Sequence, residues 1–403
     1  MKTNQIQNNT KWVEKELGEV ATFFNGKAHE NEISADGKYI VINSKFVSTN
    51  GSVAKYTNTC LSPLKKGDVV MVMSDIPKGK AIAKCFLVDK DDKYSLNQRI
   101  GGFRSTEINS SFLYYLLNRN QYFLAFDDGV NQTNLRKDDI LECPLYYPSL
   151  SEQNRIVSVL ETWDISIKKF AQKIESKKQI KKGLMQDLLT GKKRLGGFSE
   201  KWETVELGDV SKMGSGGTPK SKNEEFYDGG IPWVSIADMT AKGKYIYSTF
   251  KTLSKEGLNN SAAKIYPKGT ILYAMYASIG ECSIACVEMT SSQAILGITP
   301  NPERLDPIFL YYHLSSIKER IKLQGQQGTQ SNLNAGMVRE FMLDIPSVKE
   351  QREIARIIET SDEEITELEK KLSILKEQKR YLLNNLITGT IRTPETLSTK
   401  LTK

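Results

Sequence analysis

The sequence has few residues of the kinds that bind metals or form disulfides. Its 403 residues include only two histidines, and its five cysteines are odd in number and form no C-x-x-C pair. Zinc sites need Cys and His at short recurring spacings, and disulfide frameworks usually need an even number of cysteines. We therefore expect reduced, mostly buried thiols and no bound metal.

Long apolar runs are absent as well. No stretch approaches the roughly 20 apolar residues that cross a bilayer, and the N-terminus lacks the charged and then apolar pattern of a secretory signal. Hydrophobic residues make up 39% and charged residues 26% of the chain, which is ordinary for a soluble protein. We therefore expect a cytoplasmic protein with no membrane contact.

The common motifs of catalytic sites are missing too. Every Gly-Lys pair is followed by a residue other than Ser or Thr, which excludes a P-loop, and no H-E-x-x-H or G-x-S-x-G motif occurs. Asn301-Pro302 is followed by Glu303, so the chain lacks the Asn/Asp-Pro-Pro-aromatic motif that holds a flipped base in amino-methyltransferases. We interpret the chain as non-catalytic, with no cofactor of its own.

Positive charge is in modest excess. The chain has 56 Lys and Arg residues against 48 Asp and Glu residues, a formal net charge of +8. This balance favours an anionic partner without requiring one. The length leaves room for two or three domains, each large enough to bury its own core.

One long helical segment occurs twice, 198 residues apart. The first copy opens with P-S-L-S-E-Q at residue 148 and ends with L-L-T-G at residue 191; the second opens with P-S-V-K-E-Q at residue 346 and ends with L-I-T-G at residue 389. Each opening places Ser three residues before Glu, the pattern of a capping box, and Gly commonly follows a last helical turn. Each copy therefore predicts a helix of about forty residues, roughly 60 Å long.

Both predicted helices carry a single apolar stripe. Its members recur at alternating steps of three and four, which is typical of a coiled-coil seam. Neither helix can bury its stripe alone, so we expect the two to pack against each other. The seam consists of Ile167, Phe170, Ile174, Leu184 and Leu188 in the first helix, and Ile365, Leu368, Leu372, Leu375, Leu382 and Leu386 in the second.

Charge and chain order favour antiparallel packing. The basic end of the first helix contains Lys177, Lys178, Lys181 and Lys182, and the acidic start of the second contains Asp362, Glu363, Glu364 and Glu367. Antiparallel packing brings these clusters together, and their pairing acts on register and orientation because each exposed pair is weak. The intervening segment also leads from the end of one helix to the start of the other. A helical hairpin that only stiffens or dimerises the protein is the alternative interpretation.

The repeat extends into the segments before the helices. W-V-E-K-E-L-G-E-V at residue 12 matches W-E-T-V-E-L-G-D-V at residue 202, and residues 66–88 and 268–289 each predict a β-hairpin. The runs F-L-Y-Y-L-L and F-L-Y-Y-H-L predict the core face of a helix, so we interpret His313 as a half-buried helix residue rather than a ligand. Polar loops follow at matching positions, residues 130–135 and 328–333.

These patterns predict an α+β fold with a pseudo-twofold internal repeat. Two mixed α/β domains are joined by two long antiparallel coiled-coil helices, which would hold the domains apart on a rigid rod. The predicted boundaries are 1–147 for the first domain, 148–194 for the central helix, 195–345 for the second domain, 346–392 for the C-terminal helix and 393–403 for a disordered tail.

The loops of the two domains differ although their scaffolds match, which suggests two related surfaces that read different things. Lysines suit phosphates, Gln and Asn amides suit adenine edges, and arginines suit guanine. The candidate DNA contacts are Lys27, His29, Lys45, Lys78, Lys80, Arg99, Gln132, Asn134 and Arg136 in the first domain, and Ser215, Thr218, Lys220, Ser221, Lys222, Ser278, Gln326, Gln327, Thr329, Gln330 and Asn332 in the second. For any single one, a solvated surface role remains open.

The duplicated helices, with P-S-L-S-E-Q-x-R-I and P-S-V-K-E-Q-x-E-I openings and L-L-T-G and L-I-T-G endings, resemble those of the specificity subunit of a type I restriction-modification enzyme. The resemblance covers residues 12–392. The stretch S-G-G-T-P-K-S at residue 215, with I-P-W at residue 231, is similar to a loop of that family's target-recognition domains. The first domain lacks this stretch.

The resemblance implies that each target-recognition domain reads one half of a split, asymmetric sequence of double-stranded DNA. The helix pair would set the unread spacer and dock two methyltransferase subunits, and restriction subunits would join that assembly. S-adenosylmethionine, ATP and Mg²⁺ would be bound by those partner subunits. Ile156, Ile354 and Ile357 are candidates for the docking face, with intramolecular core as the alternative.

Three hypotheses then compete: a non-enzymatic DNA-specificity module, an enzyme that fuses a methyltransferase or nuclease, and a structural coiled-coil scaffold. The absent motifs and the small size argue against the enzyme. Duplicated domains with polar loops would be superfluous in a scaffold. The sequence therefore favours the specificity module.

Overall fold

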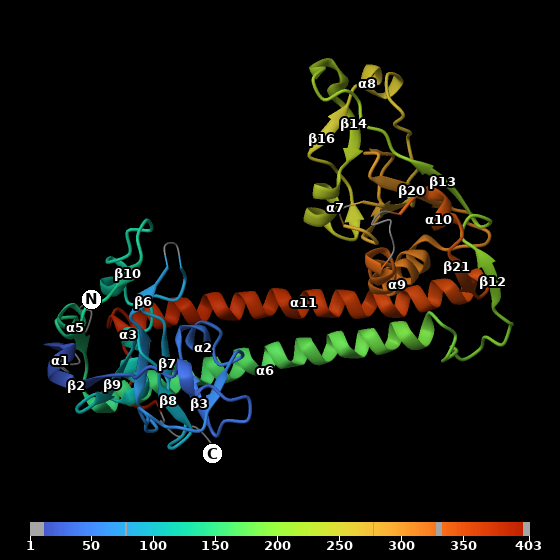
Figure 1. Cartoon of the computed structure of the whole chain (residues 1–403). Helices are drawn as coiled ribbons and strands as arrows, with labels where there is room; N and C mark the ends of the chain where they lie inside the picture. Colours follow the sequence, from blue (N-terminus) through green and yellow to red (C-terminus); the bar gives the residue numbers. More distant parts are fainter. Residues whose placement is uncertain (1–11, 77–78, 277, 328–332, 398–403) are drawn as a thin grey trace, which may run out of the picture. The chain divides into compact units, whose positions relative to one another are not determined.

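The computed structural model describes residues 12–76, 79–276, 278–327 and 333–397. The chain divides into two compact units, which we call unit 1 and unit 2 (Figure 1). Unit 1 comprises Met1–Ala171 and Lys371–Lys403, and unit 2 comprises Gln172–Lys370. Each unit therefore contains one domain and a part of each of two long helices.

An antiparallel four-stranded sheet forms the centre of the domain in unit 1. Its strand order is β2-β9-β5-β7, and a three-stranded sheet has the order β4-β3-β8. The strands are β2 (Ala21–Asn25), β3 (Tyr39–Ile42), β4 (Lys55–Thr57), β5 (Val69–Val72), β7 (Cys85–Leu87), β8 (Tyr94–Leu96) and β9 (Ile100–Ser105). β5 reads V-V-M-V and is buried throughout, so a short apolar run rather than an alternating pattern marks this central strand.

Helix α3 (Ser110–Leu117) covers this sheet with the apolar face that the sequence predicts. Its N-terminus is capped by Asn109, whose side chain accepts a hydrogen bond from the backbone of Phe112. Phe112, Leu113 and Leu117 are completely buried in the core of unit 1.

The domain of unit 2 repeats this topology. The order β13-β20-β17-β18 in its main sheet corresponds strand by strand to β2-β9-β5-β7, and β15 adds a parallel fifth strand next to β18. The strands are β13 (Ser211–Ser215), β15 (Tyr245–Ile246), β17 (Ile271–Ala274), β18 (Cys282–Ala285) and β20 (Ile295–Pro300), with β14 (Tyr227–Val234), β16 (Lys251–Leu253) and β19 (Thr290–Ser291) in a second sheet. Both predicted hairpins, β5 with β7 and β17 with β18, are confirmed.

Short strand pairs and helices complete the two domains. Three strand pairs are antiparallel ladders: β1 (Val13–Glu16) with β11 (Pro144–Tyr147), β6 (Ser74–Asp75) with β10 (Thr133–Asn134), and β12 (Glu203–Glu206) with β21 (Met342–Ile345). The remaining helices are α1 (Leu17–Val20), η1 (Glu30–Glu32), α2 (Ser44–Ser48), α4 (Gln121–Leu124), α5 (Lys137–Leu141), η2 (Glu224–Phe226), α7 (Ile236–Lys242), α8 (Lys255–Asn259), α9 (Pro307–Gln327) and α10 (Ala335–Arg339). In unit 2, α9 takes the position that α3 has in unit 1.

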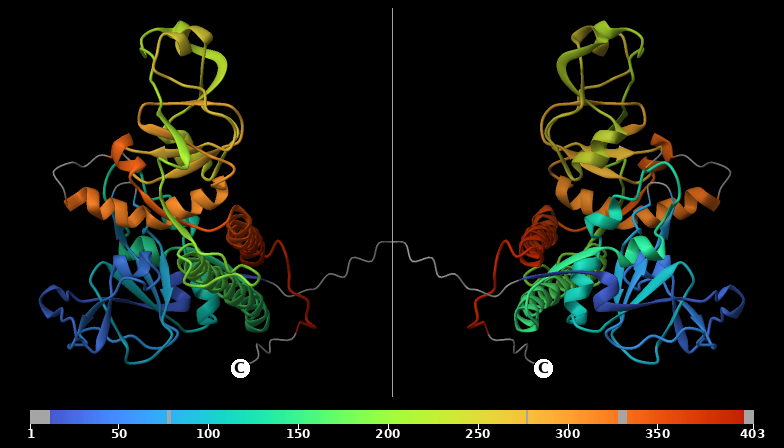
Figure 2. Two further views of the ribbon diagram at one scale, coloured as in Figure 1. Left: turned by 90° about the vertical axis from the view of Figure 1, so that its right-hand side faces the viewer. Right: turned by 90° about the vertical axis from the view of Figure 1, so that its left-hand side faces the viewer.

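The two long helices, α6 (Leu150–Leu188) and α11 (Val348–Ile387), lie side by side (Figure 1, Figure 2). In unit 2 the end of α6 runs along the start of α11, where Lys178 pairs with Glu369 at 2.7 Å. In unit 1 the start of α6 runs along the end of α11, where Lys379 pairs with Asp164 at 2.5 Å. Within unit 2, Lys181 pairs with Asp362 and Lys178 with Glu369, so a step towards the end of α6 is a step towards the start of α11. The predicted antiparallel packing is therefore confirmed.

Every residue of the predicted seam is buried or half-buried. Ile156 and Ile354 also lie inside, at 0% and 1% exposure, in the cores of unit 1 and unit 2. Ile357 is partly buried and packs against the same core as Ile354. Of the two interpretations of these three isoleucines, the structure therefore shows the intramolecular core.

A bidentate ion pair fastens the start of each long helix. In unit 1 the guanidinium of Arg392 donates to both carboxylate oxygens of Glu152, at 2.5 and 2.6 Å. In unit 2 Arg194 does the same to Glu350, at 2.8 and 2.7 Å. Both glutamates are nearly inaccessible to solvent, so the Glu of each predicted capping box is a buried partner of an arginine that follows the other helix.

Three expectations about the whole chain can be compared with the structure. None of the helices in the described part of the chain combines the length and the apolar character that a membrane crossing needs. All five cysteines are free thiols, three of them buried. The predicted disordered tail begins with Thr393, which is buried and accepts a hydrogen bond from Arg155 at 3.2 Å, and residues 398–403 lie outside the described residues.

His313 gives a testable dependence on pH. It is half-buried on α9, and burial lowers its pKa to about 4, with Asp344 opposing and Arg320 adding to the shift. The unfolded chain takes up a proton near pH 6.5 and the folded chain only near pH 4, so stability is lost as the pH falls through this window. The full loss is about 3 kcal/mol at 1.36 kcal/mol per pKa unit.

We therefore expect His313→Leu to lose less stability than the wild type between pH 7 and pH 4. The measurement is the urea midpoint of the intact chain at several pH values. If both proteins lost the same stability between pH 7 and pH 4, the loss would not arise from the lowered pKa of His313.

Candidate nucleic-acid interface

The S-G-G-T-P-K-S stretch of unit 2 continues from strand β13 as a loop pressed against the domain. The amide of Gly216 donates to the carbonyl of Ile295 at 3.0 Å, and the amide of Gly217 donates to that of Ser291 at 2.9 Å. A Cβ at Gly216 would lie 2.3 Å from the Ser291 oxygen, and one at Gly217 would lie 2.1 Å from the Ala263 nitrogen. Only glycine fits such a close backbone approach.

The I-P-W stretch explains why the two motifs occur together. Trp233 on β14 is buried, and its Nε1 donates to the carbonyl oxygen of Gly217 at 2.9 Å. The hydroxyl of Tyr227, also on β14, donates to the carbonyl of Pro219 at 3.0 Å. Side chains of β14 therefore fix the backbone of the loop. The predicted contacts Ser215, Thr218, Lys220, Ser221 and Lys222 remain exposed.

An equivalent fixed loop exists in unit 1, where the sequence shows no such motif. The amide of Gly26 donates to Ile100 at 3.4 Å, which is the position that Gly216 occupies relative to Ile295. A Cβ at Gly26 would lie 2.1 Å from the oxygen of Asn97. Lys27, the next residue, is exposed.

His29 is not a surface contact, which corrects one prediction. The residue is 1% exposed, and its Nδ1 lies 2.7 Å from the carbonyl oxygen of Lys27. A carbonyl only accepts, so Nδ1 carries the proton and Nε2 accepts from the hydroxyl of Ser95 at 2.7 Å. His29 therefore holds the loop from below, as Trp233 does in unit 2, and cannot reach a ligand without moving.

A second group of predicted contacts lies together on paired loops of unit 1. Strand β10 pairs with β6 (Figure 1). The Nε2 of Gln132 donates to the hydroxyl of Ser74 at 2.9 Å. Thr133 on β10 is buried, whereas Asn134 on β10 and Gln132 just before it are exposed. One amide side chain thus points to solvent from a paired backbone and the other from the residue next to it.

The turn after β6 adds positive charge to this region. The carboxylate of Asp75 accepts from the amides of Ala81 and Ile82, at 2.6 and 3.1 Å, and so closes the turn that carries the exposed Lys80. Arg99 is exposed in the turn before β9, and its carbonyl accepts from Met73 just before β6. The structure therefore brings Lys80, Arg99, Gln132 and Asn134 to neighbouring turns.

Other predicted contacts are placed elsewhere or are not described. Lys45 is exposed on α2, Arg136 is exposed at the start of α5, and Ser278 is half-buried in the turn between β17 and β18. Lys78, Thr329, Gln330 and Asn332 lie outside the described residues, and Gln326 and Gln327 end α9 with side chains that are not described. Leu333 and Leu135, which end the two predicted loops, have equivalent positions, because the amide of Leu333 donates to Met275 as the amide of Leu135 donates to Met73.

The sequence interpretation missed the apolar side chains of the loops in unit 1. Ile76 and Val130 are 70% and 75% exposed, next to the lysine and amide residues described above. Their signal in the sequence is weak, because single apolar residues in polar loops are common. The exposed polar and basic side chains can donate hydrogen bonds and attract anions, and no cluster of metal-ligating residues occurs among the residues with described positions.

The chain matches a family model in two places. The model describes the type I restriction modification DNA specificity domain, and it matches residues 9–180 and 199–377. The two matches correspond to the two halves of the internal repeat, each with its long helix.

Curated relatives and solved structures are similar over most of the chain. The putative type I restriction enzyme MjaX specificity subunit of Methanocaldococcus jannaschii is 26% identical over 301 residues, 71% of this chain and 69% of that protein. The MjaVIII specificity subunit of the same organism is 27% identical over 304 residues, 70% of each chain. The S subunit of a type I restriction-modification system from M. genitalium has a TM-score of 0.59 at 18% identity, with 95% of this chain and 98% of that chain covered. The last similarity shows the fold.

The fixed loop of unit 2 can be tested by limited proteolysis with trypsin. Trp233→Phe keeps the aromatic ring and removes the hydrogen bond to Gly217, so we expect faster cleavage after Lys220 and Lys222. Trp202→Phe is a matched control because the Nε1 of Trp202 is buried without a partner. Equal cleavage rates for the two variants would show that the hydrogen bond does not hold the loop.

Proposed function

We propose that this chain, which belongs to the type I restriction-modification DNA specificity family, reads a bipartite, asymmetric sequence of double-stranded DNA, one half with each domain. The observation that carries the proposal is a shared framework with different exposed side chains. Gly26 and Gly216 occupy equivalent positions, yet the loops that follow expose different residues. Two domains of one design with unlike loops suit two unlike half-sites.

The chemistry of the exposed side chains supports readout of DNA. Lys27, Lys80, Lys220 and Lys222 offer charge for phosphates, which supplies affinity without sequence information. Gln132 and Asn134 present amides that can pair bidentately with adenine. The backbone of Asn134 is paired with β6, and the Gln132 side chain donates to Ser74 of β6, so little conformational entropy would be lost on binding.

The long helices would set the spacer and dock the catalytic partners. Their lengths of 39 and 40 residues would define the unread gap between the half-sites. Ile165, Ile374 and Tyr381 of unit 1 are about half-exposed or more on these helices and offer apolar area for two methyltransferase subunits. Restriction subunits would join through that assembly, and S-adenosylmethionine, ATP and Mg²⁺ would act on the partner subunits.

The chain would be non-catalytic in this assembly. The loops that the structure describes present amides, lysines and hydroxyls, which can bind and orient nucleic acid, and these loops form no acid-base pair or activated nucleophile. A pure scaffold is the competing function. The exposed, rigidly held loops argue against it, because a scaffold has no use for two such surfaces.

Adenine methylation mapping at single-base resolution tests the proposal. DNA is compared from cells that carry this chain with its methyltransferase partner and from cells that lack only this chain. The expected result is one split motif with a fixed gap that disappears with the chain. An unchanged methylation pattern would refute DNA reading by this chain and favour the scaffold.

The amide pairs predict a reciprocal loss of specificity. Gln132→Ala with Asn134→Ala should relax the preference for one half-site, and Gln330→Ala with Asn332→Ala the preference for the other. Each lost bidentate contact should cost about 1–3 kcal/mol of base discrimination. The measurement is competition binding to duplexes with one half-site randomised. A uniform loss on all sequences would identify these residues as backbone contacts or folding residues.

Substitution of a loop lysine should change DNA affinity and its salt dependence rather than base preference. Lys220→Ala should weaken binding about equally on all duplexes and lower the slope of log K against log salt by about 1. Lys376→Ala is the control, since Lys376 is exposed on α11 and is part of neither loop. A sequence-dependent loss for Lys220→Ala would instead assign this lysine to base readout.

A further inference from the structure

Each unit contains the same three-residue contact, which we call the clasp, between its domain and the long helices. In unit 1 the hydroxyl of Tyr115 on α3 donates to Oδ2 of Asp164 on α6 at 2.8 Å. The Nζ of Lys379 on α11 donates to Oδ1 of the same carboxylate at 2.5 Å and lies 5.4 Å from the centre of the Tyr115 ring. One carboxylate therefore joins three helices.

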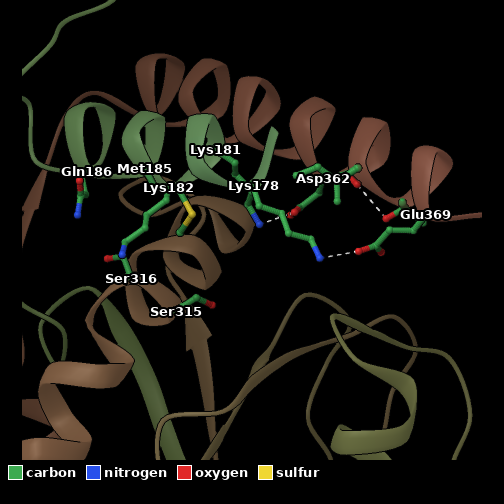
Figure 3. Close-up of a pocket in the computed structure, with 11 residues that line it drawn as sticks. Lys178, Lys181, Lys182, Met185, Gln186, Ser315, Ser316, Asp362 and Glu369 are labelled. Atoms are coloured by element: carbon green, nitrogen blue, oxygen red, sulfur yellow. Dashed lines mark hydrogen bonds and ion pairs between the residues drawn. The ribbon is translucent and has the colours of Figure 1, made fainter. Parts of the chain in front are cut away.

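The clasp of unit 2 has the same chemistry with the long helices exchanged. Tyr312 on α9 donates to Oδ2 of Asp362 on α11 at 2.6 Å, and Lys181 on α6 pairs with Oδ1. The Lys181 ammonium lies 5.6 Å from the centre of the Tyr312 ring. Figure 3 shows Lys181 and Lys178 reaching across from α6 to Asp362 and Glu369 on α11.

Both tyrosines of the clasps are buried side chains. Tyr115 and Tyr312 are 6% and 1% exposed. Burial first, and then the neighbouring aspartate, raise the pKa of both phenols far above the ordinary value, so each hydroxyl stays a donor. A buried donor of this kind has a strongly preferred partner, because breaking the bond would leave the buried hydroxyl unpaired.

A second fixed point lies along each long helix. Glu152, bound by Arg392, precedes Asp164 by twelve residues, and Glu350, bound by Arg194, precedes Asp362 by the same number. Twelve residues of α-helix correspond to about 18 Å. Both arginines also lie 5.6 Å from the ring of a tryptophan near the start of a domain, Trp12 or Trp202. Two points at this separation prevent a domain from rotating about either one.

Unit 2 holds its domain by one further contact. The Nζ of Lys244 donates to the Tyr312 hydroxyl at 2.9 Å and to Oε1 of Glu359 at 2.8 Å. Tyr245, which begins the extra strand β15, also donates to Glu359. In unit 1 the equivalent glutamate, Glu161, accepts one hydrogen bond from the hydroxyl of Ser111 on α3 at 3.0 Å. This glutamate has no lysine partner among its described contacts, so the clasp of unit 1 depends more heavily on Tyr115.

We propose that the clasps are positioning devices that restrict the protein to one spacer length between half-sites; this inference rests on the proposed function. One base pair changes the position of a half-site by about 3.4 Å and about 34° around the duplex. A domain that could swing on its helices would therefore accept neighbouring spacers. Holding the domain at two points on each helix pair removes that freedom.

The test measures methylation by the intact complex of this chain with its methyltransferase subunits. Substrates carry both half-sites with the native spacer or with one base pair more or fewer. For Tyr115→Phe we expect the rate on the altered spacers, relative to the native one, to rise about tenfold, the scale of one hydrogen bond to a charged group. The base preference within each half-site should not change.

Because unit 2 has an extra contact, we expect a different effect from the tyrosine substitution in each unit. Tyr312→Phe should relax the spacer less than Tyr115→Phe, and adding Glu359→Gln should bring it to the same level. Tyr273→Phe is the matched control, because its hydroxyl is buried without a partner and its loss breaks no hydrogen bond. Lys379→Arg, which keeps the ion pair, should retain the spacer preference, whereas Lys379→Met should relax it.

The outcomes separate this inference from the proposed function. A wild-type complex that methylates no split motif would overturn both. A wild type with one preferred spacer, and a Tyr115→Phe variant with the same spacer profile and unchanged thermal stability, would overturn the positioning role alone. Relaxed spacing in Tyr273→Phe to the same extent would also overturn it, since any loosened core would then have the effect.

Discussion

The structure depends on the need of two long helices to cover each other. A helix of about forty residues with one apolar stripe is not stable alone in water, because its stability comes from burying that stripe. Here α6 begins in unit 1 and ends in unit 2, and α11 does the reverse. Each unit therefore contains segments that are distant in the sequence, and neither domain can complete its core without the helix that follows the other domain. Leu386 of α11 in the core of unit 1 shows this directly.

The two domains fix their loops to the sheet in the same way, although the loops themselves differ between the domains. In both, a glycine permits close approach of the loop to the sheet, and a buried nitrogen donor fixes the carbonyl of the next residue: Nδ1 of His29 for Lys27, and Nε1 of Trp233 for Gly217. His29 and Trp233 are buried under their loops, whereas the side chains that differ between the two loops are exposed to solvent. Changes of exposed residues can then alter what is read without altering how the loop is held.

Local patterns predicted much of this fold, and contacts between distant residues account for what they missed. Caps, apolar periodicity and internal repetition marked both long helices and both hairpins, because these signals lie within a few residues of each other. The arginine partners of the buried Glu152 and Glu350 are 240 and 156 residues away in the sequence, so the local pattern suggested only a capping box. Tyr115 and Tyr312 belong to apolar runs, which concealed the role of their hydroxyls. His29 looked like a loop contact because its partner Ser95 is also remote.

Contacts between distant residues also show which of the basic side chains are available to an anionic partner. A cluster of lysines near the end of α6 resembles a DNA-binding stripe, but Lys177, Lys178 and Lys181 are paired with acidic residues of α11. These lysines act on the register of the helices, and their charge is largely neutralised. The exposed lysines of the fixed loops, such as Lys27 and Lys220, lie instead on the surfaces that vary between the domains. Under the proposed function, affinity and specificity would arise on the same loops, and the helices would act only on the distance between half-sites.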